Sequence, residues 1–204
     1  MDRTVIGLSG VAGSGKDLFF KLLSKKLNIR RFALADALKR EASTWTYKQY
    51  GIDALNCNRE EKERIRPFLV EHGIQKRKAS KGKHWVNLLD RDIKGFLLNA
   101  MTDDIPVVTD IRYQEYEGDE VDWLTKDLQG ILVHISQFTV ERASGKKEFL
   151  APANEEEARM DPVLKNLCDY RVTWPRAGDD LTQSDILNQH VDKFVEWYED
   201  RRNI

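Results

Sequence analysis

Residues 10–17 read Gly-Val-Ala-Gly-Ser-Gly-Lys-Asp and lie between a short apolar run, residues 4–8, and a helical pattern that begins at Leu18. A strand, a loop with the spacing G-x-x-x-x-G-K and a helix form the sequence context of a phosphate-binding loop. The glycines let the backbone curl so that several N–H groups point into one concavity. The helix N-terminus adds partial positive charge there and Lys16 adds a full one. The sequence therefore predicts a phosphate cradle. The alternative, an ordinary strand–helix turn, would not need a lysine after its last glycine.

The composition favours a single α/β domain. The chain has 204 residues, of which 41% are hydrophobic, enough for a sizeable core. The net charge of −1 argues against a nucleic acid or a membrane surface held by bulk charge. Two cysteines without partner spacing indicate free thiols. No apolar run is long enough for a membrane helix and no signal peptide is apparent, so a cytoplasmic protein is expected.

Apolar strand-like runs alternate with helical patterns along the chain, which is typical of a mostly parallel sheet covered by helices on both faces. Strands are expected at residues 4–9, 31–35, 106–109, 130–136 and 170–174. Helices are expected at residues 37–50 and 114–127, loops at 75–84, and a polar segment without a core pattern at 137–154.

Three of the predicted strands end in residues with functional chemistry, and ligands of open parallel sheets bind beyond the carboxyl ends of strands. The first end is the loop itself. The second is Asp36, which can cap the next helix, followed by Lys39, whose charge at a helix start suggests an anionic ligand. The third is Asp110-Ile111-Arg112. An apolar strand that ends in Asp beside a phosphate loop is typical of a Mg²⁺ site, and Arg112 is suited to gripping a phosphate. A helix cap for Asp110 and an ion pair for Arg112 are the alternatives.

Two further features suggest contacts with a nucleotide. Trp85 lies beside Lys83 and His84 at a helix start and is placed to stack on a planar base; the alternative is an aromatic packed in the core. Arg142 and Lys146 in the polar segment are suited to closing over phosphates as a lid, or are residues of a solvated loop.

The chain resembles the P-loop nucleoside-monophosphate kinase superfamily and within it the deoxynucleoside monophosphate kinases of tailed bacteriophages. The resemblance is carried by Leu8-Ser9-Gly10 running into Ser14-Gly15-Lys16-Asp17, Phe32 to Lys39, Arg66-Pro67-Phe68-Leu69, Trp85-Val86-Asn87, Val107 to Arg112, the glutamates at 155–157 and Asp169-Tyr170. Animal-type phosphomevalonate kinases are similar too, with Ser-Gly-Lys-Asp in the loop, a Leu-Lys helix start and an Asp-x-Arg strand end. Most phosphate loops carry Ser or Thr at the position of Asp17, whereas both of these relatives carry Asp.

The resemblance implies a three-layer P-loop NTPase fold with a five-stranded parallel sheet of order 2-3-1-4-5. It implies one kinase domain over residues 1–204, with an acceptor-binding helical insertion at about 37–100 and a lid-like segment at about 137–154. ATP and Mg²⁺ are the implied co-substrates. Small-molecule nucleotides are the expected partners, with no nucleic acid or membrane, and a homodimer is left open. A phage-encoded protein would act in the host cytoplasm.

The resemblance also implies roles for residues. Lys16, Asp17, Asp110 and Arg112 are expected to be catalytic, and Asp17 and Asp110 to organise Mg²⁺. The expected ATP-binding residues are Gly10, Ala12, Gly13, Ser14, Gly15, Lys16, Asp17, Leu18 and Arg142. The expected acceptor-binding residues are Asp36, Lys39, Arg66, Trp85 and Arg112.

The implied reaction is transfer of the ATP γ-phosphoryl group to a (deoxy)nucleoside 5′-monophosphate. Phosphomevalonate kinase is the nearest alternative, because it handles phosphates in the same way and differs in the acceptor pocket. A non-catalytic nucleotide-binding regulatory module is the alternative from another class. A guanine-reading switch is not indicated, because the sequence has no Asn-Lys-x-Asp motif.

Overall fold

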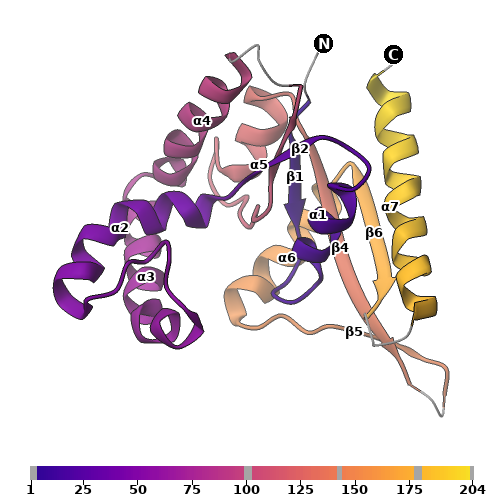
Figure 1. Ribbon diagram of the computed structural model, residues 1–204, viewed down its shortest axis with the longest axis horizontal. Coiled ribbons are helices and arrows are strands. Elements are labelled where there is room, and N and C mark those ends of the chain that lie inside the picture. Colours follow the sequence, from indigo (N-terminus) through magenta and orange to yellow (C-terminus); the bar gives the residue numbers. More distant parts are fainter. Residues whose placement is uncertain (1–3, 99–102, 142–143, 177–180, 203–204) are drawn as a thin grey trace.

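The computed structural model describes residues 4–98, 103–141, 144–176 and 181–202 (Figure 1). The strands are β1 (Ile6–Ser9), β2 (Ile29–Phe32), β3 (Ile105–Val108), β4 (Ile131–Val140), β5 (Lys147–Phe149) and β6 (Tyr170–Pro175). The helices are α1 (Lys16–Leu23), α2 (Leu34–Tyr50), α3 (Arg59–Ala79), α4 (Lys83–Leu98), α5 (Glu120–Asp122), the π-helical turn η1 (Trp123–Asp127), α6 (Glu155–Leu167) and α7 (Leu181–Arg202). Within these ranges, no helix is both long and apolar enough to cross a membrane.

Five parallel strands form the sheet in the order β2-β3-β1-β4-β6. Because β5 is antiparallel, this is the order 2-3-1-4-5 when only parallel strands are counted, and the predicted fold class is confirmed. The register pairs Gly7 of β1 with Val108 of β3 on one side and with Leu132 of β4 on the other. The strand that leads into Asp110 therefore lies directly beside the strand that leads into the phosphate loop.

The sixth strand differs from the prediction. Residues 137–154 were expected to be a polar lid-like segment, but β4 continues to Val140 and pairs with the antiparallel β5. Phe138 of β4 pairs with Pro175 of β6 on one side and with Phe149 of β5 on the other. Strand β5 therefore pairs with the same edge of β4 as β1 does, beyond the point where β1 ends. Because β1 ends first, the backbone of β4 has unpaired hydrogen-bonding groups there, and β5 pairs with them.

Side chains alternate between two cores across the sheet, as the period of a strand dictates. Ile6 and Leu8 of β1 face the core that α1 and α7 cover, where Phe19 and Phe194 are fully buried. Val5 faces the opposite core, which is covered by α2, α4, α5, η1 and α6. Helices therefore cover both faces, and the architecture has three layers.

A third, smaller core joins α2 and α3 away from the sheet. Its buried members are Ala42, Ile52, Ala54, Ile65 and Leu69. In Figure 1 these two helices extend to one side of the sheet, and α3 packs on α2 and α4. This outer layer falls within residues 37–100, for which acceptor binding stays a prediction.

The secondary-structure predictions for two segments are wrong. Residues 75–84 are mostly helical, because Lys76, Arg77 and Lys78 lie in the last turn of α3, where the helix dipole favours cations. The helix expected at 114–127 forms only from Glu120 onward. Residues 110–119 stay irregular because buried carboxylates bind their backbone N–H groups, as described below.

Candidate active site

The phosphate loop has the predicted curled backbone. Gly10, Gly13 and Gly15 have φ angles of 129°, 78° and 94°, a region that residues with side chains rarely adopt. At Gly10 a Cβ atom would lie 2.2 Å from the carbonyl oxygen of Ile135. At Gly15 it would lie 2.8 Å from the ring of Trp174. These positions therefore require glycine for conformation and for space.

Trp174 of β6 packs against the phosphate loop and fixes its position. Its indole Nε1 donates to the carbonyl oxygen of Ser14 at 3.1 Å, and both residues are fully buried. Ser14 N also donates to the carbonyl oxygen of Val11 at 3.1 Å, which closes a turn within the loop. The loop is thus fixed by the neighbouring strand as well as by its own glycines.

Lys16 begins α1, and its ammonium group folds back onto the loop. Nζ donates to the carbonyl oxygens of Gly10 at 2.7 Å and Val11 at 2.9 Å. Burial lowers the pKa of Lys16, and the positive charge of Arg112 lowers it further.

The charges of three carboxylates also act on Lys16. Glu157, Asp17 and Asp110 raise the pKa of Lys16 through their negative charge, in opposition to burial and Arg112. The charges of Arg112, Asp17 and Asp110 therefore all act on Lys16, and the catalytic roles of these four residues stay predictions.

Asp110 is buried and caps a helix other than the one expected. Its two carboxylate oxygens accept hydrogen bonds from the backbone N–H groups of Leu34 and Ala35, each at 2.8 Å, at the start of α2. Burial raises the pKa of Asp110, although these donors and Arg112 act in the opposite direction. The expectation that Asp36 caps this helix is wrong, because α2 begins two residues before it, at Leu34.

The other predicted acceptor-binding residues on α2 and α3 have partners of their own. Asp36 pairs with Arg31 at 2.6 Å and with Lys39 at 3.9 Å. Arg66 is exposed on α3 and pairs with Glu63 at 2.6 Å. None of these contacts joins the phosphate loop, and their acceptor-binding role stays a prediction.

Trp85 lies in the core between α3 and α4. It is 6% exposed, its Nε1 donates to the carbonyl oxygen of Gly73 at 3.2 Å, and its ring meets those of His72 and His84 edge to face. A side chain so covered offers little of its ring to a ligand. This placement favours the core alternative and does not support the predicted stacking on a base.

The predicted lid arginine, Arg142, lies outside the described residues. Lys146 adjoins β5, and its carbonyl oxygen accepts a hydrogen bond from Glu141 N at 2.9 Å. Leu150, just after β5, has a side chain 3.4 Å from the position that a Cβ atom would take at Gly13. The end of the β4–β5 hairpin therefore lies against the phosphate loop.

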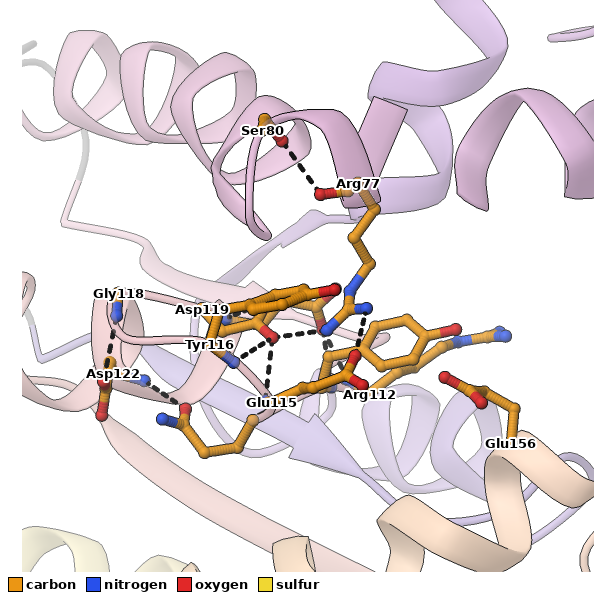
Figure 2. Close-up of polar contacts among 12 residues, drawn as sticks. Arg77, Ser80, Arg112, Glu115, Tyr116, Gly118, Asp119, Asp122 and Glu156 are labelled. Atoms are coloured by element: carbon orange, nitrogen blue, oxygen red, sulfur yellow. Dashed lines mark hydrogen bonds and ion pairs between the residues drawn. The ribbon is translucent and has the colours of Figure 1, made fainter. Parts of the chain in front are cut away.

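The buried side chain of Arg77 joins several residues of the loop after β3, and we call it the hub. The sequence did not reveal this role, because Arg77 lies in a run of charged residues of the kind that usually faces solvent. It is 7% exposed and pairs with Glu115 at 2.8 Å and with fully buried Asp119 at 2.5 Å. Its guanidinium also lies 3.8 Å from the ring centre of Tyr113. Figure 2 shows the Arg77 side chain reaching from α3 into the loop that follows β3.

Two buried carboxylates complete the packing of that loop, which carries Arg112. Asp119 accepts from the backbone N–H of Glu115 at 3.0 Å. Glu120 accepts from the backbone N–H groups of Arg112 at 2.6 Å and Tyr113 at 3.2 Å. Burial raises the pKa of Glu120 to about 8, with a further contribution from the charge of Asp119. The backbone at Arg112 is therefore fixed by a carboxyl group that holds its proton near neutral pH.

No protein-family model and no curated protein sequence matches the chain. Similar solved structures include a dephospho-CoA kinase from Campylobacter jejuni, with 12% identity, 100% of each chain covered and a TM-score of 0.49. A shikimate kinase from Bacteroides thetaiotaomicron has 13% identity, coverage of 95% of this chain and 98% of that chain, and a TM-score of 0.41. A shikimate kinase from Acinetobacter baumannii in complex with shikimate has 12% identity, 95% coverage of each chain and a TM-score of 0.42. Because all three TM-scores are below 0.5, neither the fold described above nor the function proposed below depends on these likenesses.

Replacement of Arg77 tests the buried hub. Arg77→Met should lower the free energy of unfolding by about 3 kcal/mol or more, because it leaves Asp119 as a buried charge without its cation. Urea denaturation followed by tryptophan fluorescence measures this. Arg40→Met is the control: Arg40 pairs with Asp92 on the surface, and its loss should cost less than about 1 kcal/mol. Equal effects of the two substitutions would contradict the hub.

The pH dependence of stability tests Glu120. Between pH 4.5 and about 8 the folded protein keeps a proton that the unfolded protein releases, so stability should fall as pH rises through this window. Glu120→Gln removes that contribution and should gain stability relative to the unmodified protein when pH is raised from 5 to 8. Glu117→Gln, an exposed change in the same loop, is the control. A Glu120→Gln difference that is constant with pH would show that this carboxyl group is ionised in the folded protein.

Proposed function

We propose that the protein is an ATP-dependent phosphotransferase whose acceptor is a (deoxy)nucleoside 5′-monophosphate. The observation that carries the proposal is the phosphate loop, a curled backbone at the end of β1 with Lys16 at its base. The charge of Arg112, four residues after β3, also acts on Lys16 and lowers its pKa. Two cations near one set of backbone N–H donors are suited to binding a polyphosphate.

The donor phosphates would lie on the loop. The backbone N–H groups of residues 12–17 and the ammonium of Lys16 would hold the β- and γ-phosphates of ATP, with Leu18 next to them at the start of α1. Arg142 is proposed as a further contact to ATP. Lys16 needs only to exchange its two carbonyl partners for phosphate oxygens. This arrangement neutralises charge on the transferred group by fixed donors, which is the main contribution that proteins make to phosphoryl transfer.

The carboxylates of Asp17 and Asp110 are the groups proposed to hold a magnesium ion. Asp17 is exposed and Asp110 is buried, and the negative charge of both acts on Lys16. Each oxygen of Asp110 already accepts one hydrogen bond from α2. Magnesium is usually held by one or two carboxylates together with substrate phosphates and water. Asp17 and Asp110 would hold the ion, directly or through water, and it would neutralise charge on the transferred phosphoryl group.

The acceptor phosphate would be held by Arg112 together with Lys39 and Arg66, and Asp36 would contact the acceptor. No general base is needed, because the acceptor phosphate is already an ionised nucleophile. Positioning in line and neutralisation of charge then supply the rate.

A hollow beside the loop supports a site for the nucleoside part of ATP. It has a volume of about 160 Å³ and is lined by Phe149, whose side chain is exposed, and by Arg176 among others. A second hollow of about 60 Å³ shares Phe149 with it and includes Val11 of the loop. An exposed aromatic ring and a guanidinium are groups on which a planar base stacks.

Replacement of Lys16 tests the catalytic mechanism. Lys16→Ala should lower kcat by about a hundredfold or more with the fold intact, because it removes a fixed positive charge from the transferred phosphate. ADP release measured in a coupled assay, with circular dichroism as a check on folding, gives the answer. Lys21→Ala is the matched control on the exposed face of α1 and should leave kcat unchanged. Near-full activity of Lys16→Ala would contradict the mechanism.

The choice of acceptor is tested by the same assay across the four deoxynucleoside monophosphates and phosphomevalonate. Since Trp85 is buried, the preference for a nucleotide acceptor rests on the resemblance in sequence. Turnover with at least one deoxynucleoside monophosphate is expected. Turnover with phosphomevalonate alone would establish the alternative kinase, and ATP binding without turnover of any acceptor would favour a regulatory module.

A further inference from the structure

A carboxylate of the protein itself lies on the phosphate loop. Both side-chain oxygens of Glu157 accept a hydrogen bond from the backbone N–H of Ala12, at 3.1 and 3.2 Å. Ala12 is the third residue of the loop and is exposed to solvent. In Figure 1, α6 lies beside the loop that joins β1 to α1. An N–H group that the proposed function would assign to an anionic ligand is therefore already bound to an anion.

The start of α6 fixes the direction of this carboxylate. Asn154 is the N-cap residue of α6, and its Oδ1 accepts from Glu157 N at 2.9 Å. The Glu157 carboxylate also accepts from the backbone N–H of Ala153 at 3.0 Å. A glutamate three residues after the N-cap is placed by the helix itself to turn back toward preceding N–H groups. Glu157 thus bridges the first turn of α6 and the phosphate loop.

The positive charges near the Ala12 N–H group favour an anion there, whether it is the Glu157 carboxylate or a phosphate. The positive charges of Lys16 and Arg112 act on this region, and Glu157 has the largest effect of the three carboxylates that raise the pKa of Lys16. A carboxylate resembles two oxygens of a phosphoryl group in charge and in its preference for N–H donors. Two anions on one N–H group would repel each other and overlap, so a phosphate and Glu157 exclude each other at Ala12.

We propose that Glu157 competes with the phosphates of the nucleotide for the loop and so sets the affinity of the site. In the nucleotide-free protein, Glu157 occupies the N–H group of Ala12. When a nucleotide binds, the carboxylate leaves, and the first turn of α6 is released from the loop. This inference rests on the proposed function, because it requires that the loop binds a nucleoside triphosphate.

Calorimetry with ATP and Mg²⁺ tests the competition. Glu157→Gln keeps the length of the side chain and removes its charge, and Glu157→Ala removes the side chain beyond Cβ. Both should bind ATP about tenfold more tightly than the unmodified protein, since a hydrogen bond to a charged group is worth about one power of ten or more in a binding constant. Glu155→Gln is the matched control: it makes the same charge change in the same exposed helical turn. Its affinity should stay within about twofold.

The outcomes separate this inference from the proposed function. Unchanged or weaker binding by Glu157→Gln, in a protein that otherwise binds ATP and turns over, would overturn the competition alone. Equal gains for Glu155→Gln and Glu157→Gln would overturn it too, because they would show a general charge effect. Absence of ATP binding by the unmodified protein and by both Glu157 variants would overturn the proposed function and this inference with it.

Discussion

The backbone of the phosphate loop is the constraint on which the rest of the site depends. Three glycines at positive φ turn N–H groups toward one side, and neither Gly10 nor Gly15 has room for a side chain. The atoms that crowd them belong to Ile135, in the middle of β4, and to Trp174, near the carboxyl end of β6. The loop therefore holds its shape only if the sheet has the order observed here, with β4 beside β1 and β6 beside β4.

Carboxylates organise the surroundings of that loop by binding backbone N–H groups. Asp110 caps α2, Glu120 holds the backbone at Arg112, and Glu157 reaches the loop from α6. Asp110 and Glu157 each link two segments that are distant in sequence, whereas Glu120 acts within the loop that it follows. These acids take backbone N–H groups as hydrogen-bond partners, and Lys16 donates to the carbonyl oxygens of Gly10 and Val11. We propose that the charges of Lys16 and Arg112 thereby serve an anionic ligand. The proposed chemistry is the consequence of that division of roles.

The sequence predicted the parts of this structure that depend on local pattern. The glycine spacing of residues 10–17 led to the loop conformation, and the apolar runs led to the parallel strands. Contacts between segments that are distant in sequence could not be predicted from it. The cap that Asp110 provides for α2 depends on a contact across 76 positions. A tryptophan beside basic residues, Trp85, has the same sequence pattern whether it packs in the core or stacks on a ligand.

Charge runs were the least informative part of the sequence. Arg77 stands among lysines that look solvated, yet it is buried against Asp119, and only the fold distinguishes it from its neighbours. The three glutamates at 155–157 likewise look alike, although the geometry of the helix start directs Glu157 to the loop. In both cases the position within a helical turn determines which charged group acts.

The central claim is that residues 12–17 form a cradle for the phosphates of ATP. A ¹⁵N-labelled sample titrated with ATP and Mg²⁺ and followed by amide chemical shifts tests it most directly. The amides of residues 12–17 should show the largest shifts and should saturate together with one dissociation constant. Saturable shifts elsewhere with the loop amides unchanged, or no shifts at millimolar ATP, would contradict it.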